Sequence, residues 1–372
     1  MVDKSGQLRR RQGEAGSHKT RILQQLEQSL RKHWRLGQNM VLCWAPDPKG
    51  VLTLMVPHYF LGNLTAGGQG GELAEKEQFV SAVIGGSCLK SHGEIFSIAQ
   101  RLGVSPSFIK LDGVLGEDPE MLAAADAIIS SYGISYVGSR AVLLFDIAEF
   151  SLYTPFEQAS QLNSLSYSMN SAYNKLQRQG VDVNFARTTT GDGYYVWNRD
   201  QGAYPDLDML SFLLLILIDN AVARSQASGN TVPVIRSAFH IGSHYELFQA
   251  EGVNPSVLSY IVGDVTITLA RMLESAQAGQ IVLGNFQAHL PERDGLCGAQ
   301  EFVVQAIAEL KELDKLRIAG QSLNDISVVT PEQGALQVLS MVDKHGMTLE
   351  AVNLELDIEL ADERLRLGAR QR

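Results

Sequence analysis

The order of hydrophobic patterns between residues 139 and 285 constrains the fold more than any other feature of the sequence. It opens with a short apolar run at 141–145 that ends in an acid, which is typical of a central strand. The elements that follow are a helix from Thr154-Pro155 to Gly180, a hairpin with strands at 181–185 and 194–197 around Thr190-Gly191-Asp192-Gly193, an apolar helix at 206–225, a strand at 232–241, an extended run at 260–262, a helix at 265–276 and a strand at 280–283. The order βαββαβ predicts an α+β domain of the ferredoxin-like type, an antiparallel sheet with helices on one face.

The first 40 residues differ in charge from the rest of the chain. They hold nine Lys or Arg against three acidic residues, although the whole chain has a net charge of −10. Leu23, Leu26, Leu30 and Trp34 recur three or four residues apart, which predicts one apolar face of a helix. Residues 1–40 are therefore a basic amphipathic arm. It either docks on its own domain or a second copy, or makes peripheral contact with an anionic membrane.

Residues 41–138 carry no recognisable chemistry and are interpreted, from their position, as an N-terminal regulatory or sensory region of mixed α/β structure. Strands are expected at 41–43 and 51–56, and helices at 75–84, 92–102 and 119–132. The glycine-rich stretch 66–71 is expected to be a flexible loop. It lacks the Lys-Ser/Thr of a phosphate-binding loop. The remaining divisions are a catalytic domain at 139–360 and a C-terminal tail at 361–372.

Composition excludes several classes of protein. The acidic balance argues against a general nucleic-acid binder, because coating phosphates requires a basic surface. The three cysteines, Cys43, Cys88 and Cys297, are too few and too far apart for a disulfide framework or a metal cluster, which favours a cytoplasmic location. The apolar run Met209–Ile218 is half the length that a membrane span requires, so it predicts a buried helix and no transmembrane segment.

Two acids stand at positions where adjacent strands could bring them together. Asp146 ends the strand at 141–145, and Asp192 lies in the Gly-Asp-Gly turn of the hairpin. Two neighbouring carboxylates repel each other unless a cation lies between them, and hard divalent ions prefer oxygen ligands. A pair of such ions can hold both the attacking and the leaving oxygen in phosphoryl transfer. Arg271, on the helix at 265–276, has the charge and shape to stabilise the transition state.

These motifs together resemble the catalytic domain of class III nucleotide cyclases, the adenylate and guanylate cyclase family. The resemblance covers a little under half of the chain, and the two acids are 46 positions apart, close to the family's spacing. The matching segments are Phe145–Ser151 and Thr189–Tyr194, similar to the two metal motifs; Arg236–Gly242, with Arg236, His240 and Gly242 retained; Ile261–Gly263 through Ala270-Arg271-Met272; and, more faintly, Val342–Gly346.

The resemblance implies a role for each of several residues. Asp146, Asp192 and the backbone carbonyl of Ile147 would bind two Mg²⁺ or Mn²⁺ ions. Arg271 would be the catalytic residue that stabilises the transition state. The family's phosphate-binding lysine aligns with Asp343, so Lys344, one position later, would bind the triphosphate. Family members build each site between two subunits, which implies a homodimer with two equal sites.

The base-reading positions depart from the family pattern. Ile267 stands where the family usually has an asparagine, and Thr268 or Thr266 offers a nearby hydroxyl. Thr188 stands where adenine readers have a lysine and guanine readers often a glutamate, and Tyr260 stands where the family usually has an acid or a small polar residue. Thr188, Tyr260 and Thr268 are thus the candidate substrate-binding residues.

The resemblance implies an enzyme, a phosphorus-oxygen lyase that forms a 3′,5′-cyclic nucleotide and pyrophosphate from a nucleoside triphosphate, with ATP as the expected substrate. One alternative is a pyrimidine (UTP or CTP) cyclase of bacterial antiviral signalling, favoured by the bulk of Tyr260 and the lack of charge at Thr188. Another is a catalytically degenerate cyclase-like dimerising sensor. A cyclic-dinucleotide synthase is a further alternative, but its Gly-Gly-acid-acid-Phe turn is absent from the hairpin.

Overall fold

The computed structural model of the chain has mixed α/β architecture and divides into two compact units. The structure describes residues 4–66, 71–116, 118–199, 204–290, 294–313, 316–330, 334–342 and 346–369. Unit 1 comprises residues 1–137 and 245–261, and unit 2 comprises 138–244 and 262–372. Residues 245–261, which the sequence analysis assigned to the C-terminal domain, therefore belong to unit 1. They form the end of the strand at 235–251 and most of the strand at 254–262. The sequence analysis expected shorter strands here, at 232–241 and 260–262.

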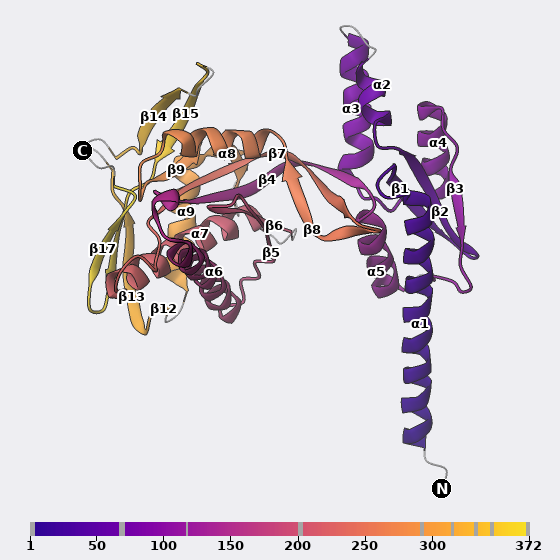
Figure 1. Cartoon of the computed structure of the whole chain (residues 1–372), viewed down its shortest axis with the longest axis horizontal. Coiled ribbons are helices and arrows are strands. Elements are labelled where there is room, and N and C mark those ends of the chain that lie inside the picture. Colours follow the sequence, from indigo (N-terminus) through magenta and orange to yellow (C-terminus); the bar gives the residue numbers. More distant parts are fainter. Residues whose placement is uncertain are drawn as a thin grey trace. The chain divides into compact units, whose positions relative to one another are not determined.

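Unit 1 is built on a three-stranded antiparallel sheet in the order β1-β2-β3 (Figure 1). The predicted strands and helices are present, and the sequence analysis missed β3 and α2. Residues 67–70, within the expected glycine-rich loop, lie outside the described residues. The elements are α1 (Lys4–Trp34), β1 (Asn39–Asp47), β2 (Gly50–Pro57), α2 (Phe60–Ala66), α3 (Gly71–Gly85), α4 (His92–Leu102), β3 (Ser107–Lys110) and α5 (Pro119–Ser130).

The helix α1 packs within unit 1 through the face that its sequence pattern marks. Leu26 and Leu30 are fully buried in one core with side chains of β1, β2, β3 and α5. Trp34 meets Tyr132 edge to face, with ring centroids 5.4 Å apart. This part of the arm therefore buries its apolar face within the unit, as one of the two interpretations of the pattern predicts.

Unit 2 is built on a mixed sheet in the order β14-β15-β9-β7-β4-β6-β5, with β8 pairing on β7. Neighbours β4 and β6 are antiparallel, as are β5 and β6, whereas β7 and β9 are parallel. The first elements along this part of the chain are β4 (Ile134–Ile147), η1 (Phe150–Leu152), α6 (Pro155–Arg178), β5 (Phe185–Thr189), β6 (Gly193–Asn198), α7 (Pro205–Gln226), β7 (Ile235–Glu251), β8 (Asn254–Val262), α8 (Asp264–Ser275) and β9 (Ile281–Gly284). The end of β7 and all but the last residue of β8 belong to unit 1. The strand expected from residue 181 begins only at Phe185, because the amide of Val181 still bonds the carbonyl of Leu176 at the end of α6.

The part of the chain after β9 adds the helix α9, the strands β14 and β15 of the main sheet, the two-stranded sheet β10-β11 and a four-stranded sheet, most of which the sequence analysis did not predict. The four-stranded sheet has the order β12-β13-β16-β17. These elements are β10 (Gln287–His289), β11 (Leu296–Gly298), α9 (Ala299–Glu312), β12 (Arg317–Ile318), β13 (Gln321–Val328), β14 (Gln337–Val342), β15 (Thr348–Asn353), β16 (Leu356–Leu360) and β17 (Arg364–Leu367).

The helices of unit 2 cover both faces of its main sheet (Figure 1). On one face, alternate residues of β4 pack with α6, α7 and α9 in one core, and α7 is buried along most of its length. On the other face lies α8, where Val265, Leu269 and Met272 are fully buried. None of the helices in the described part of the chain combines the length and apolar character needed to cross a membrane.

Candidate active site

The strand β4 places Asp146 on the α8 face of the sheet. Leu143, Phe145 and Ile147 belong to the core against α6 and α7. Because side chains alternate along a strand, Leu144 and Asp146 point to the opposite face. Asp146 thus lies at the end of a strand whose buried residues hold it firmly, with its side chain 14% exposed.

The β5–β6 turn brings Asp192 beside Asp146, as the sequence predicts. Asp146 pairs with Gly193 across the β4–β6 ladder, and the amide of Ile147 donates to the carbonyl of Asp192 at 3.0 Å. A Cβ at Gly193 would lie 1.8 Å from the carbonyl oxygen of Phe145, so only glycine fits there. The Thr190 hydroxyl donates to Asp192 Oδ1 at 3.3 Å. The two acids are therefore fixed by the backbone of adjacent strands.

The electrostatics of Asp146 combine three opposing influences. Burial raises its pKa above the ordinary value, the Arg236 guanidinium lowers it, and the neighbouring Asp192 carboxylate raises it; the net shift is upward. Arg236 Nε donates to Asp146 Oδ2, and Arg236 Nη1 donates to the carbonyl of Ala276 at 3.2 Å. The sequence analysis noted Arg236 within a matching segment but did not predict that it pairs with Asp146.

The two acids suit a divalent cation. They supply carboxylate oxygens on adjacent strands, and the upward influence of Asp192 on the pKa of Asp146 is the repulsion that a cation between them would relieve. Across the described residues there is no group of three or more His, Cys, Asp or Glu side chains able to hold a metal ion. Any cation here would therefore be held by two carboxylates, with backbone oxygens, substrate oxygens or water completing its shell.

The helix α8 carries two of the predicted residues, Arg271 and Thr268, with partly exposed side chains. Gly263 begins the helix at φ 152°, where a Cβ would lie 2.8 Å from the backbone of His244. The hydroxyl of Tyr195 donates to the carbonyl of Thr266 at 3.0 Å and so ties β6 to the first turn of α8. These contacts hold α8 against the face of the sheet that carries Asp146.

Thr188 lies on the same face of the sheet as Asp146. It pairs directly with Tyr195, which in turn pairs with Leu144, and directly opposed residues share a face. Tyr260 is partly buried on β8 and belongs to unit 1. Lys344 lies outside the described residues.

His240, which the matching segment retains, is packed into the sheet. A Cβ at Gly284 would lie 2.2 Å from its Nδ1, and Phe286 meets its ring edge to face. Its Nδ1 is buried and has no hydrogen-bond partner among the described residues. Burial lowers its pKa to about 4, so the ring is neutral at pH 7. The close fit with Gly284 assigns it a packing role.

Comparison with known proteins gives distant structural similarity only. Neither a protein-family model nor a curated protein matches the sequence. Similar solved structures include the guanylate cyclase domain of RhGC from Catenaria anguillulae in complex with GTP, at 16% identity and TM-score 0.36, covering 59% of this chain and 97% of that chain. The adenylyl cyclase CyaB from P. aeruginosa is similar at 13% identity and TM-score 0.36, covering 59% of this chain and 95% of that chain. Similarity this low does not establish an activity, so function must be argued from the residues of the site.

Proposed function

We propose that the chain is a class III nucleotide cyclase, which converts a nucleoside triphosphate, ATP in the first instance, into its 3′,5′-cyclic monophosphate and pyrophosphate. The observation that carries the proposal is the meeting of Asp146 and Asp192 at the ends of adjacent strands. The sheet order β7-β4-β6-β5, with α6 and α7 as the connecting helices, supports a ferredoxin-like arrangement of this unit.

The residues of the site suit a phosphoryl transfer. Asp146, Asp192 and the carbonyl of Ile147 would hold two Mg²⁺ or Mn²⁺ ions, whose chemistry is to polarise the phosphate and lower the pKa of the attacking hydroxyl. Arg236 lowers the pKa of Asp146 and so favours the ionised carboxylate that a cation requires. Arg271 would bind charge that develops on the phosphate, for which its fixed fork of donors is suited.

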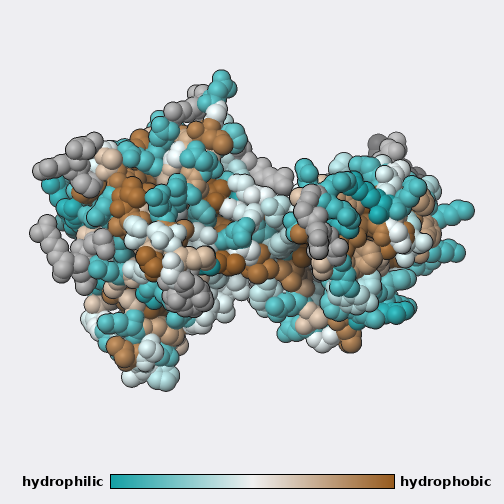
Figure 2. Space-filling view, turned by 90° about the horizontal axis from the view of Figure 1, so that it is seen from above, coloured by the Kyte–Doolittle hydropathy of each residue, from teal (hydrophilic) through white to brown (hydrophobic). Residues whose placement is uncertain are grey.

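We propose a homodimer, because the metal-binding acids and Arg271 lie on different elements and family members combine them across subunits. Apolar patches interrupt the hydrophilic surface of unit 2 in the view from the α8 side (Figure 2). Val262, at the end of β8, and Ile267, in the first turn of α8, are 52% and 48% exposed. Exposed apolar groups beside the partly exposed Arg271 are suited to a subunit interface.

The identity of the base is the open part of the proposal. Thr188 presents a neutral hydroxyl on the face that carries Asp146. A neutral donor of this kind favours the second candidate, a pyrimidine (UTP or CTP) cyclase, because no lysine or acid stands at position 188 to select a purine.

The proposal is tested by turnover of the four ribonucleoside triphosphates in Mn²⁺. Asp146→Asn and Asp192→Asn are each expected to lower turnover by ~100-fold or more, because each removes a charged metal ligand. The melting temperature should stay nearly unchanged, since relieving the repulsion of two acids offsets the lost contacts. Asp182→Asn, at an exposed acid of the same unit, is the matched control and should leave turnover intact. Equal turnover in excess chelator would contradict the metal role, and absence of any turnover would leave the degenerate sensor as the better account.

A further inference from the structure

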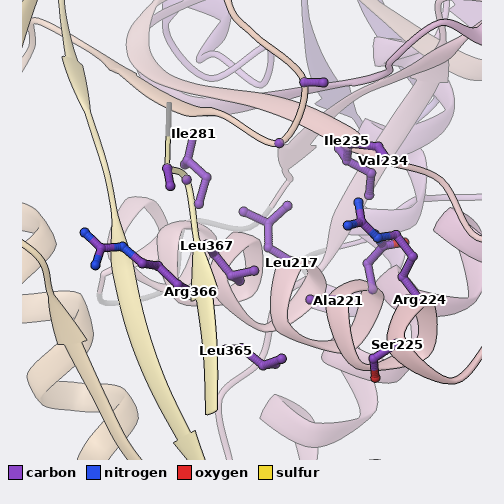
Figure 3. Close-up of a pocket in the computed structure, with 15 residues that line it drawn as sticks. Leu217, Ala221, Arg224, Ser225, Val234, Ile235, Ile281, Leu365, Arg366 and Leu367 are labelled. Carbon is purple, nitrogen blue, oxygen red and sulfur yellow. The ribbon is translucent and has the colours of Figure 1, made fainter. Parts of the chain in front are cut away.

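Unit 2 contains a cavity of about 530 Å³ that none of the residues proposed for catalysis lines. It lies between the last turns of α7, the start of β7, the segment before β9, and β17 (Figure 3). Its volume falls within the ~300–1,000 Å³ of small-molecule sites. Polar and apolar groups share its wall about equally, and the apolar part includes Leu217, Val234, Ile235, Ile281, Leu365 and Leu367.

Asn220, one of the lining residues, has a buried side-chain oxygen that lacks a partner among the described residues. Asn220 is 6% exposed, and its Nδ2 donates to the carbonyl of Pro233 at 3.0 Å. A carbonyl only accepts, so this contact fixes the orientation of the amide and makes the other atom the oxygen. Asn220 Oδ1 is buried and meets no donor among the described residues. A buried acceptor without a donor costs about 1–3 kcal/mol, which a ligand with an N–H or O–H group would recover.

Two arginines are among the described residues that line the cavity. Arg224 lines it, and Figure 3 shows its guanidinium turned toward Val234 and Ile235. Arg366 extends away from Leu217 in the same view and pairs with Glu355 at 3.0 Å. Among the lining residues that the structure describes, the charge available to a ligand is therefore that of Arg224.

We propose that this cavity binds a small amphiphilic anion: a molecule with an apolar body, an anionic group for Arg224 and an N–H or O–H donor for Asn220 Oδ1. The site does not depend on the proposed cyclase activity. Its walls nevertheless adjoin the acid pair, because Ile235 directly precedes Arg236 and the amide of Ala148 donates to the carbonyl of Val234 at 2.9 Å.

The test uses three fluorescent probes on the full chain. 8-Anilinonaphthalene-1-sulfonate has the apolar body, the anion and the N–H donor; N-phenyl-1-naphthylamine lacks the sulfonate; and N-methyl-N-phenyl-1-naphthylamine lacks the donor as well. We expect saturable binding of the sulfonate probe at one site per chain. Arg224→Gln should weaken it about tenfold and leave the uncharged probe unaffected. The methylated probe should bind several-fold more weakly than N-phenyl-1-naphthylamine.

Two further variants distinguish this cavity from other surfaces. Ala221→Phe fills the cavity from α7 and should abolish binding of all three probes. Arg178→Gln, at an exposed arginine on α6 outside the cavity wall, makes the same change in charge and should not alter any affinity. The proposal is overturned if the sulfonate probe shows no saturable binding, if Arg224→Gln and Arg178→Gln have equal effects, or if folded Ala221→Phe protein binds as well as the unaltered chain.

Discussion

Replacing Arg236 with glutamine removes the cation that pairs with Asp146 and leaves a half-buried acid beside a second acid. The Arg236 and Asp146 side chains are 31% and 14% exposed, so the pair lies between a surface ion pair, worth at most ~1 kcal/mol, and a fully buried one, whose disruption costs ~3–5 kcal/mol. We therefore expect Arg236→Gln to lower the free energy of unfolding of unit 2 by about 2 kcal/mol at pH 7.

The loss of unfolding free energy caused by Arg236→Gln should be larger at high pH than at low pH. The pKa of Asp146 is already raised in the folded chain, and the substitution raises it further, because burial and Asp192 then act without opposition. A raised carboxyl pKa makes stability fall as pH rises from the unfolded value of ~3.9 to the folded value. The penalty of Arg236→Gln should thus be larger at pH 7 than at pH 4, because it shrinks as the pH falls through the raised folded-state pKa of Asp146 and the carboxyl becomes protonated.

Urea titrations read out by hydrogen exchange of the 141–147 peptide measure this stability within unit 2. Adding Asp146→Asn to Arg236→Gln should recover most of the loss, since the unpaired charge is removed. The control is Arg364→Gln: this arginine is 80% exposed in its pair with Glu359, so the change should be under ~0.5 kcal/mol. A loss that is the same at pH 4 and pH 7, or that Asp146→Asn does not recover, would refute the reasoning.

Three further predictions concern the site. Asp146→Asn and Arg271→Ala proteins should each be inactive in a cyclase assay. Mixing the two proteins should restore part of the activity, because each heterodimer then contains one intact site. No recovery of activity despite measured subunit exchange would refute a shared site. Tyr260→Ala should broaden selectivity when initial rates are compared with all four triphosphates, and an unchanged preference would remove the tyrosine from the base pocket. Gly193→Ala should destabilise unit 2 by more than ~3 kcal/mol, because its Cβ would overlap a carbonyl of β4. Gly298→Ala, in the same unit, would bring its Cβ no closer than 3.8 Å to a neighbour and should be tolerated in the same urea titration; equal effects would contradict the close approach.

Local signals predicted the elements that position the acids. Thr154 caps α6 by accepting the amide of Glu157, with Pro155 in the first turn, as the Thr-Pro sequence indicates. The uninterrupted apolar run of α7 predicted a buried helix, and it is one. The meeting of Asp146 and Asp192 could be expected from local signals. The apolar run places Asp146 at the end of a strand, and the Gly-Asp-Gly sequence places Asp192 in the tight turn of a hairpin that can pair with that strand.

Features that depend on long-range pairing escaped prediction. The partner of Arg236 depends on β7 lying beside β4, which no local pattern of β7 encodes. The continuation of β7 to Glu251 lacks clear alternation in the sequence, so the assignment of 245–261 to unit 1 could not be anticipated. The strands β12 to β17 are short and have mixed burial. Three of their pairings join consecutive strands, but the pairs β13-β16 and β15-β9, which join them into sheets, connect distant segments.

The products formed from a triphosphate test the proposed function most directly. The purified full chain is incubated with each of the four ribonucleoside triphosphates and Mn²⁺, and nucleotide and phosphate products are quantified by mass spectrometry and pyrophosphate release. The proposal predicts a 3′,5′-cyclic monophosphate and pyrophosphate in equal amounts from at least one triphosphate, with neither formed by Asp192→Asn. Release of orthophosphate with a nucleoside diphosphate, or no product from any of the four, would contradict it.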